Sequence, residues 1–215
     1  MSGATGTIAV LDYGIGNLAS AHRALLHLGA DARLVRDPEA AADADGVVLP
    51  GVGAFGRCAS ALEESGLGAV ARRALEDGTP FLGICVGLQL LYEGSEEASG
   101  VTGFGALAGT VQRLAPGVKC PQMQWNPLLA VGPEPSAILA GLPDEPWMYF
   151  VHSYAPPVGA ETVAVCEYGG PVAAAIERGH IWGTQFHPEK SGTLGLAVLA
   201  NFVERVGARS VATGV

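Results

Sequence analysis

The first half of the chain alternates between short apolar runs and amphipathic stretches, and this alternation constrains the fold more than any other feature. The runs expected to form strands are Thr7–Leu11, Ala32–Val35, Gly46–Leu49 and Pro80–Ile84. The stretches expected to form helices between them are Asn17–Leu28, Ala54–Glu64 and Leu67–Glu76, with Asn17 as the N-cap of the first. Such alternation predicts an α/β fold in which helices cover both faces of a mostly parallel sheet.

After about Gly100 the apolar runs follow one another more closely and predict further strands. These are Thr110–Leu114, Met148–Val151, Thr162–Cys166, Val172–Glu177 and His180–Gln185. Gly169-Gly170 and Gly179 lie between the last three and predict hairpins. A final helix is expected at Thr193–Val206. We therefore expect one three-layer α/β domain over residues 7–206, a flexible N-terminus at residues 1–6 and a loose C-terminal tail at residues 207–215.

Composition and charge argue against several classes of protein. Hydrophobic residues make up 49% of the 215 residues, enough to bury a core. The net charge of −9 disfavours nucleic-acid binding, which needs Lys and Arg to neutralise phosphates. The four cysteines form no C-x-x-C pair and fit no zinc spacing. Because neither a signal peptide nor an apolar run long enough for a membrane span is evident, we expect a cytoplasmic protein with reduced thiols and no membrane partner.

The segment Gly83-Ile84-Cys85-Val86-Gly87 carries the strongest chemical signal in the sequence. It has the G-x-nucleophile-x-G form of a nucleophile elbow, with a strand-like run before it and a helix-like run after it. Glycines on both sides remove Cβ atoms that would collide at so sharp a turn. The following helix N-terminus would favour the thiolate, and the N–H of Val86 can point at a developing oxyanion. We interpret Cys85 as a nucleophile, a buried structural cysteine being the alternative.

A cysteine nucleophile needs a base that a third group orients, and His187 has the sequence context of that base. It lies in Gln185–Glu189, at the end of a strand-like run, where Pro188 ends the strand ladder. Glu189 follows two residues later and has the chemistry to orient and charge-stabilise an imidazole. Alone, this His-Pro-Glu turn could be structural; with the elbow it predicts a catalytic triad of Cys85, His187 and Glu189.

The motifs GICVGLQLL and TQFHPE together resemble those of the class I (triad) glutamine amidotransferases. The resemblance implies that family's flavodoxin-like α/β fold and no metal or organic cofactor. It implies that Cys85 attacks the side-chain amide of glutamine, that His187 relays protons and that Glu189 holds His187. The loop Pro50–Gly53 is similar to the family's second oxyanion element. The oxyanion hole that the resemblance implies comprises Val52, Gly53 and Val86.

Three further segments narrow the resemblance to one family of amidotransferases. They are Asp12–Leu18, Met123–Asn126 and Tyr149–Tyr154, and they resemble the glutaminase subunits of imidazole glycerol phosphate synthase. The resemblance runs from about Ile8 to Val206. It implies a heterodimer with a (β/α)8-barrel cyclase subunit, which consumes the ammonia in histidine biosynthesis and forms imidazole glycerol phosphate and aminoimidazole carboxamide ribotide. It also implies weak activity without that partner.

The same resemblance implies roles for individual residues. The residues implied to bind glutamine are Gln89, Glu97, Ser153 and Tyr154. The residues implied to face the cyclase subunit are Tyr149, Trp125, Asn126 and Lys190. The chain departs from the pattern at Gln124, where many members have glycine.

Other functions compete with this hypothesis. Gly14-x-Gly16-x-x-Ala19 follows a strand and precedes a helix, and Asp37 lies about 20 residues on, as in a dinucleotide-binding fingerprint. A nicotinamide enzyme would leave the cysteine elbow and the histidine turn without a role, so the amidotransferase interpretation is favoured. The remaining alternatives are a stand-alone glutaminase, the glutaminase part of another class I amidotransferase, and a binding protein that keeps the fold without the chemistry.

Overall fold

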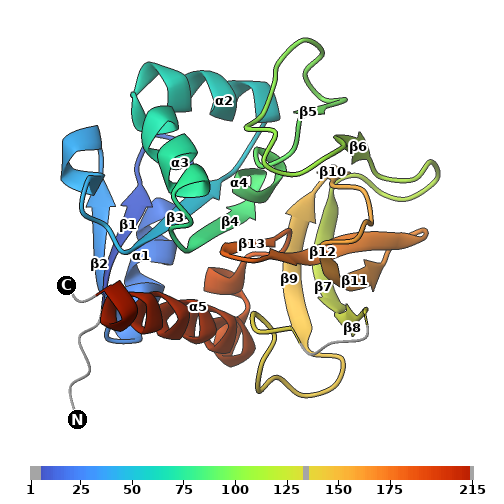
Figure 1. Cartoon of the computed structure of the whole chain (residues 1–215). Helices are drawn as coiled ribbons and strands as arrows, with labels where there is room; N and C mark the ends of the chain where they lie inside the picture. The colour runs from blue at the N-terminus through green and yellow to red at the C-terminus, as the bar shows by residue number, and fades with distance from the viewer. Residues whose placement is uncertain (1–5, 133–135, 214–215) are drawn as a thin grey trace.

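The computed structural model describes residues 6–132 and 136–213 of the chain (Figure 1). Most of the predicted flexible N-terminus therefore lies outside the described residues, and Gly6, its last member, is buried. Among the described residues no helix is both long and apolar enough to cross a membrane.

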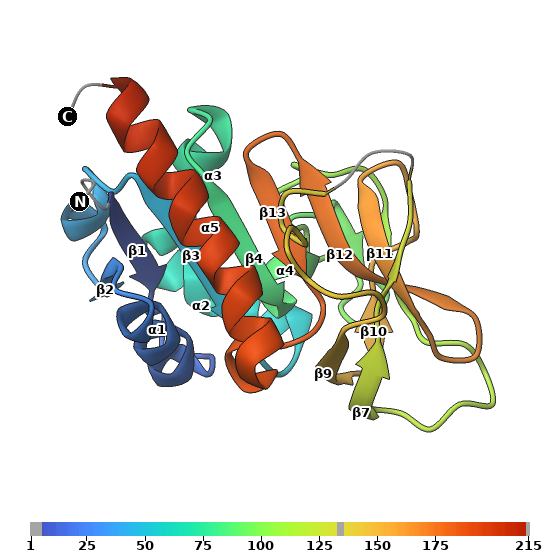
Figure 2. The same ribbon diagram turned by 90° about the horizontal axis from the view of Figure 1, so that it is seen from below.

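An eight-stranded mixed sheet forms the centre of the molecule (Figure 2). In spatial order its strands are β2 (Asp31–Val35), β1 (Thr7–Leu11), β3 (Gly46–Gly51), β4 (Phe81–Cys85), β13 (Ile181–Thr184), β12 (Pro171–Arg178), β11 (Thr162–Glu167) and β8 (Leu129–Ala130). The strands from β2 to β13 are parallel, and those from β13 to β8 pair antiparallel. The predicted parallel sheet and the two glycine hairpins are confirmed.

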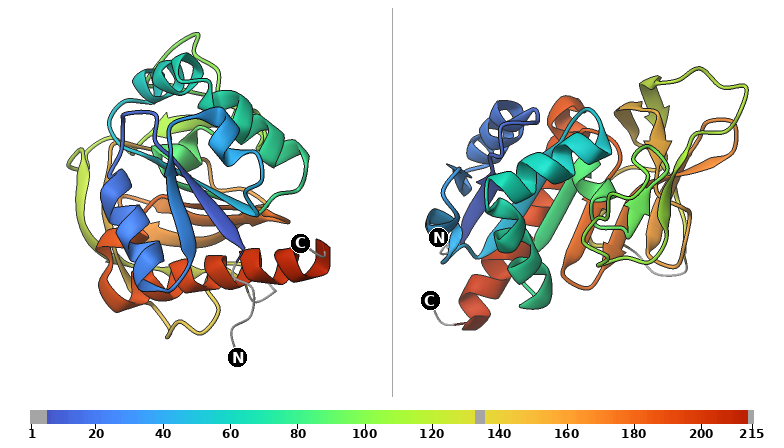
Figure 3. Two further views of the ribbon diagram at one scale, coloured as in Figure 1. Left: turned by 90° about the vertical axis from the view of Figure 1, so that its left-hand side faces the viewer. Right: turned by 90° about the horizontal axis from the view of Figure 1, so that it is seen from above.

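Helices cover both faces of the parallel half of the sheet, as predicted (Figure 3). On one face lie α1 (Leu18–His27) and α5 (Gly192–Thr213), and on the other lie α2 (Phe55–Glu64) and α3 (Leu67–Glu76). Apolar contacts hold these layers together. Trp182 of β13 packs edge-on against Phe202 of α5 with ring centroids 6.0 Å apart, and both side chains are buried. Two short 3-10 helices, η1 (Pro38–Ala41) and η2 (Pro188–Lys190), complete this half.

A two-stranded antiparallel ribbon lies beside the antiparallel half of the sheet and is formed by β7 (Gln122–Pro127) and β9 (Trp147–His152) (Figure 1). The predictions included β9 but missed β7, whose sequence QMQWNP has no β-branched residue. A small three-stranded sheet lies nearby, with the order β10 (Tyr154–Ala155), β6 (Thr110–Arg113) and β5 (Gly94–Ser95).

The C-terminal segment differs from its prediction. The last helix was expected to end at Val206 before a loose tail, but α5 continues to Thr213. Val206 is fully buried and Ser210 is only 4% exposed, so this part of the helix still packs against the domain. That packing outweighs the helix-breaking tendency of Gly207.

Candidate active site

Three loops meet at the carboxyl edge of the sheet, where α/β proteins usually bind their ligands. Because β3, β4 and β13 are parallel neighbours, the segments that follow them all emerge at this edge. The segment Pro50–Gly53 lies at the end of β3, Cys85 ends β4, and Gln185–Glu189 follows β13. The topology thus brings together motifs that are about 35 and 100 residues apart in the chain.

Cys85 occupies a strained turn between β4 and the short helix α4 (Val86–Gln89). Its φ of 56° and ψ of −110° are rarely adopted by a residue with a side chain, and such strain is typical of catalytic turns. A Cβ atom on Gly87 would lie 1.8 Å from the carbonyl oxygen of Leu49, and one on Gly83 would lie 2.7 Å from that of Gly87. The expected role of both glycines is therefore confirmed by the geometry: any side chain would push the elbow off the sheet.

The helix after the elbow is shorter than predicted. A helix-like run from Val86 to Gly94 was expected, but α4 spans only four residues. Leu91 and Tyr92 already donate to carbonyls three residues back, as in a tightening turn. A single turn carries little of a helix macrodipole, so the predicted stabilisation of the thiolate by the helix is much reduced.

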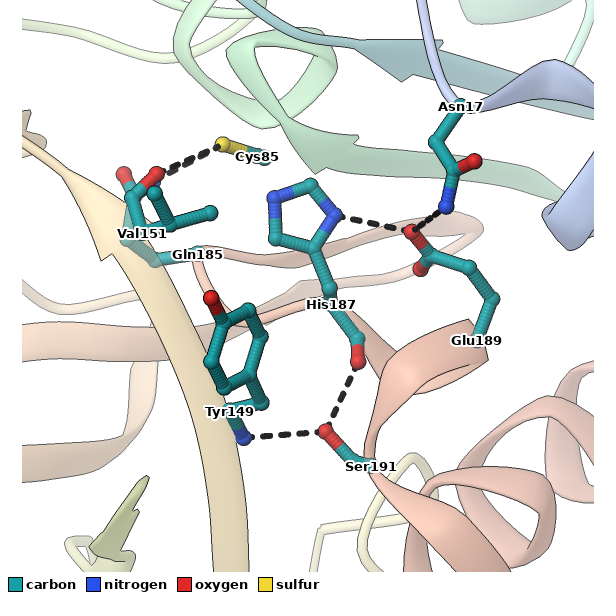
Figure 4. A network of polar contacts seen from close by, with 8 residues as sticks. All are labelled: Asn17, Cys85, Tyr149, Val151, Gln185, His187, Glu189 and Ser191. Atoms are coloured by element: carbon teal, nitrogen blue, oxygen red, sulfur yellow. Dashed lines mark hydrogen bonds and ion pairs between the residues drawn. The ribbon is translucent and has the colours of Figure 1, made fainter. Parts of the chain in front are cut away.

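His187 and Glu189 form a buried pair next to the cysteine (Figure 4). Nδ1 of His187 lies 2.8 Å from Oε1 of Glu189, and the side chains are 1% and 2% exposed. Burial disfavours the imidazolium, but hydrogen bonding and charge from Cys85 and Glu189 outweigh it and raise the pKa of His187 to about 9. Asn17 donates to the same Glu189 oxygen at 3.2 Å, and its side chain makes no helix-capping hydrogen bond. Asn17 is therefore the N-cap of α1 as predicted, but it caps the helix through its main-chain carbonyl and not through its side chain.

The main chain of His187 is tied to β9. Its N–H donates to the carbonyl oxygen of Tyr149 at 3.0 Å. The hydroxyl of Ser191 donates to the His187 carbonyl at 2.7 Å and accepts the Tyr149 N–H at 3.0 Å (Figure 4). Sequence reasoning missed Ser191, for which the only signal was its place just after the His-Pro-Glu motif.

Besides His187, two groups face the sulfur of Cys85. Sγ lies 3.9 Å from the carbonyl oxygen of Val151 and 3.6 Å from the amide nitrogen Nε2 of Gln185 (Figure 4). Nε2 of His187 is buried and has no hydrogen-bond partner among the described residues. It is therefore available to exchange a proton with a molecule bound at the sulfur.

A cavity of about 230 Å³ opens onto the sulfur. The residues that line it are Val52, Gly53, Cys85, Val86, Gln89, Glu97, Pro121, Val151, His152, Ser153, Tyr154 and His187. They include every residue that the sequence assigned to the oxyanion hole and to substrate binding. His152 was not assigned a role; burial lowers its pKa to about 4, so its ring is neutral near pH 7.

Hydrogen bonds fix the polar side chains of the cavity. Nε2 of Gln89 donates to the carbonyl of Tyr154 at 2.8 Å and to Oε1 of Gln185 at 3.1 Å. Oε2 of Glu97 accepts the N–H of Phe55, at the start of α2, at 2.8 Å. The substrate side of the cavity thus contains a carboxylate and an amide that are held before any ligand binds.

The Pro50–Gly53 loop is held by two side chains beneath it. The hydroxyl of Tyr13 donates to the carbonyl of Pro50 at 2.7 Å, and the thiol of Cys58 donates to that of Val52 at 3.3 Å. Burial raises the pKa of Tyr13, so its phenol stays a donor. Gly53 has a φ of +89°, which favours glycine at that position.

The residues assigned to the partner interface separate into two groups. Trp125 is 45% exposed and packs edge-on against Tyr149 with ring centroids 5.9 Å apart, and Lys190 is exposed. Asn126 is 6% exposed, donates to the carbonyl of Glu167 at 2.8 Å and accepts from Gln124. Because side chains alternate along a strand, Asn126 points to the face opposite Trp125, and its place in the interface stays a prediction.

The residues of the dinucleotide fingerprint have other contacts. Asp37 caps η1 by accepting the N–H of Glu39 at 3.0 Å, and Asn17 just after the glycines reaches the histidine pair.

Comparisons with known proteins agree with this geometry. The family model described as glutamine amidotransferase class-I matches residues 9–206. The chain is 50% identical to the imidazole glycerol phosphate synthase subunit HisH of Methanothermobacter thermautotrophicus, over 94% of this chain and 100% of that one. It is 47% identical to the HisH subunit of a Synechococcus strain, over 96% and 97% of the two chains.

Solved structures show the same fold at lower sequence identity. A putative GMP synthase protein from Thermoplasma acidophilum superposes with a TM-score of 0.73 at 22% identity, covering 98% of both chains. PurLQS from Thermotoga maritima gives a TM-score of 0.72 at 19% identity, covering 94% of this chain and 99% of that one. The chain belongs to the class I glutamine amidotransferases and, within them, to the family of HisH subunits of imidazole glycerol phosphate synthase.

Proposed function

We propose that this chain hydrolyses L-glutamine at Cys85 and delivers the ammonia to a cyclase subunit of imidazole glycerol phosphate synthase. The observation that carries the proposal is the meeting of the cysteine elbow with the buried His187–Glu189 pair at one cavity. Nucleophilic catalysis by cysteine needs this arrangement: the cysteine lies next to a histidine, and a carboxylate holds the second nitrogen of that histidine.

Acylation begins with glutamine in the cavity. The Cys85 thiolate attacks the side-chain amide carbon, and the carbonyl oxygen becomes an oxyanion facing the N–H of Val86 and the Val52–Gly53 loop. His187 donates its Nε2 proton to the amide nitrogen as the C–N bond breaks, so ammonia leaves and a γ-glutamyl thioester remains. Glu189 stabilises the imidazolium that exists before this proton transfer.

Hydrolysis then regenerates the enzyme. His187, now neutral, accepts a proton from a water molecule that attacks the thioester carbon. The second tetrahedral intermediate collapses, the C–S bond breaks with its electron pair on sulfur, and glutamate is released. Glu97 is suited to pair with the α-amino group of glutamine, because its carboxylate faces the cavity while Phe55 holds one of its oxygens.

The outer face of the β7–β9 ribbon is the part of this chain best suited to receive a cyclase partner of (β/α)8-barrel fold in a heterodimer. It presents Met123, Trp125 and Trp147, which are 61%, 45% and 55% exposed. Aromatic residues and methionine are enriched in protein interfaces. Tyr149 links this face to the catalytic histidine through its main chain, so the partner would dock next to the site that makes the ammonia.

Glutamate release from glutamine tests the proposal. Wild type and Cys85→Ala would each be assayed alone and with a cyclase subunit plus its nucleotide ligand. We expect release that requires Cys85 and increases strongly with the partner. Release that requires Cys85 but ignores the partner would instead indicate a stand-alone glutaminase or a component of another amidotransferase, and release by Cys85→Ala would refute the nucleophile.

A further inference from the structure

We propose that Gln185 is a further catalytic residue, which stabilises the Cys85 thiolate by donating an amide N–H to the sulfur. The inference rests on the proposed function of Cys85 and adds a group that the triad does not contain. Gln185 lies two residues before His187 and is fully buried. Its main-chain N–H donates to the carbonyl of Ala174 on β12 at 2.8 Å, which fixes the residue to the sheet.

The hydrogen-bond chain determines which end of the Gln185 amide faces the sulfur. The carbonyl oxygen of Tyr154 can only accept, so the atom of Gln89 that lies 2.8 Å from it is the nitrogen. The same nitrogen lies 3.1 Å from the Gln185 amide and donates to it, so its partner there is the oxygen. The nitrogen of Gln185 consequently faces Sγ of Cys85 at 3.6 Å (Figure 4).

The surroundings of the sulfur give this N–H its importance. Besides His187, the carbonyl oxygen of Val151 faces Sγ, and it favours the protonated thiol because it can only accept a hydrogen bond. The helix α4 behind the cysteine is a single turn and contributes little of a macrodipole. The Gln185 amide is therefore a neutral donor that favours negative charge on the sulfur, in addition to the His187 imidazole.

Two steps of the reaction place negative charge on Sγ. The thiolate carries it before it attacks the glutamine amide. The sulfur becomes negatively charged again when the second tetrahedral intermediate collapses and the C–S bond breaks with its electron pair on sulfur. The Gln185 N–H lowers the energy of the sulfur anion in both, and the Gln185 oxygen holds the Gln89 side chain at the substrate cavity.

Three variants separate these roles. Gln185→Met keeps an unbranched side chain and removes both amide contacts. Gln185→Glu keeps an oxygen acceptor for Gln89, but its carboxylate cannot donate to the sulfur. Gln122→Met is the matched control, because Gln122 is also fully buried and its Nε2 lies 3.6 Å from the sulfur of another buried cysteine, Cys166.

The assay is alkylation of Cys85 by iodoacetamide across the neutral to alkaline range, followed by mass spectrometry of the Cys85 peptide, together with kcat/KM for glutamate release. We expect both Gln185 variants to move the pH midpoint of alkylation upward and to lower kcat/KM roughly tenfold, the low end for a hydrogen bond to a charged group. Gln122→Met should change neither.

Two results would overturn the inference. If Gln185→Met behaves as Gln122→Met does, the amide has no role at the sulfur. If Gln185→Glu keeps the wild-type midpoint while Gln185→Met does not, the residue acts through Gln89 alone. Failure of the proposed function looks different, because wild-type enzyme alkylated at Cys85 would then still release glutamate.

Discussion

Replacing Gly87 by alanine tests whether the packing of the elbow on the sheet creates the active site. The added Cβ would lie 1.8 Å from the carbonyl oxygen of Leu49, whereas contacts of this kind are essentially never shorter than 3.0 Å. The elbow and β3 must therefore separate by about 1.2 Å. The Cβ position is fixed by the backbone of residue 87 and the oxygen belongs to the backbone of Leu49, so no side-chain rotation relieves the clash. Leu49 directly precedes the Pro50–Gly53 loop, so the separation displaces Cys85 from the proposed oxyanion hole.

The expected losses follow from that displacement. Overpacking in a well-packed core costs about 1–3 kcal/mol of unfolding free energy, and a rigid backbone contact belongs at the upper end of that range. A misplacement of about 1 Å in catalytic geometry costs roughly 100-fold in rate. We therefore expect Gly87→Ala to lose about 3 kcal/mol of stability and roughly 100-fold in kcat/KM for glutamate release.

Urea unfolding and steady-state kinetics measure these two losses. Gly159→Ala is the control, because the nearest atom to its added Cβ is the flexible carboxylate oxygen of Glu161 at 3.6 Å. We expect that variant to remain within about 0.5 kcal/mol of wild type. If Gly87→Ala were as stable and as active as Gly159→Ala, the argument that this glycine is required by contact between the elbow and β3 would be wrong.

Three further predictions follow from the site and the ribbon. The pKa of His187 is raised from 6.5 to about 9, so its contribution to stability is full below pH 6.5 and is lost as the pH rises through 9. Urea unfolding should therefore show the difference in unfolding free energy between wild type and His187→Gln shrinking over this pH window, and a growing difference would contradict the prediction. Asn17→Ala should lower kcat roughly three- to tenfold with little change in KM, because Glu189 loses a donor; an unchanged kcat would exclude a positioning role. Trp147→Ala should weaken binding of the cyclase subunit at least roughly tenfold, as measured by calorimetry. The control Val211→Ala changes another highly exposed residue, on α5, and should leave binding unchanged; equal effects would place the interface elsewhere.

Much of the fold was predictable because its signals are local. The structure places β1 at Thr7–Leu11 and α3 at Leu67–Glu76, as the apolar runs and their periodicity predicted. Gly169-Gly170 and Gly179 adopt positive φ at the two hairpin turns, where glycine was the turn signal. Sequence also singled out Cys85 and His187, because their short-range motifs require sharp turns after strands.

The strand β7 and the end of α5 were not predictable in the same way. The segment QMQWNP alternates polar and apolar residues, but it has no β-branched residue and its apolar side chains Met123 and Trp125 are exposed, so its pairing with β9 decides that it is a strand. The helix α5 continues past Gly207 because Ser210 remains buried against the domain. In both places tertiary contacts outweigh the local preferences that a sequence displays.

By itself, the sequence determined the α/β layers, the order of the elements and the residues with the chemistry of a triad, since each of these depends on neighbours along the chain. The tertiary structure decided the contacts that tune the site. Asn17 meets Glu189 across 172 residues and Gln185 meets Cys85 across 100, and no periodicity links residues so far apart. It also turned Asn126 inward while leaving Trp125 outside. Which polar atoms share a buried cavity depends on the register and packing of strands from both ends of the chain, and that information exists only once the sheet has formed.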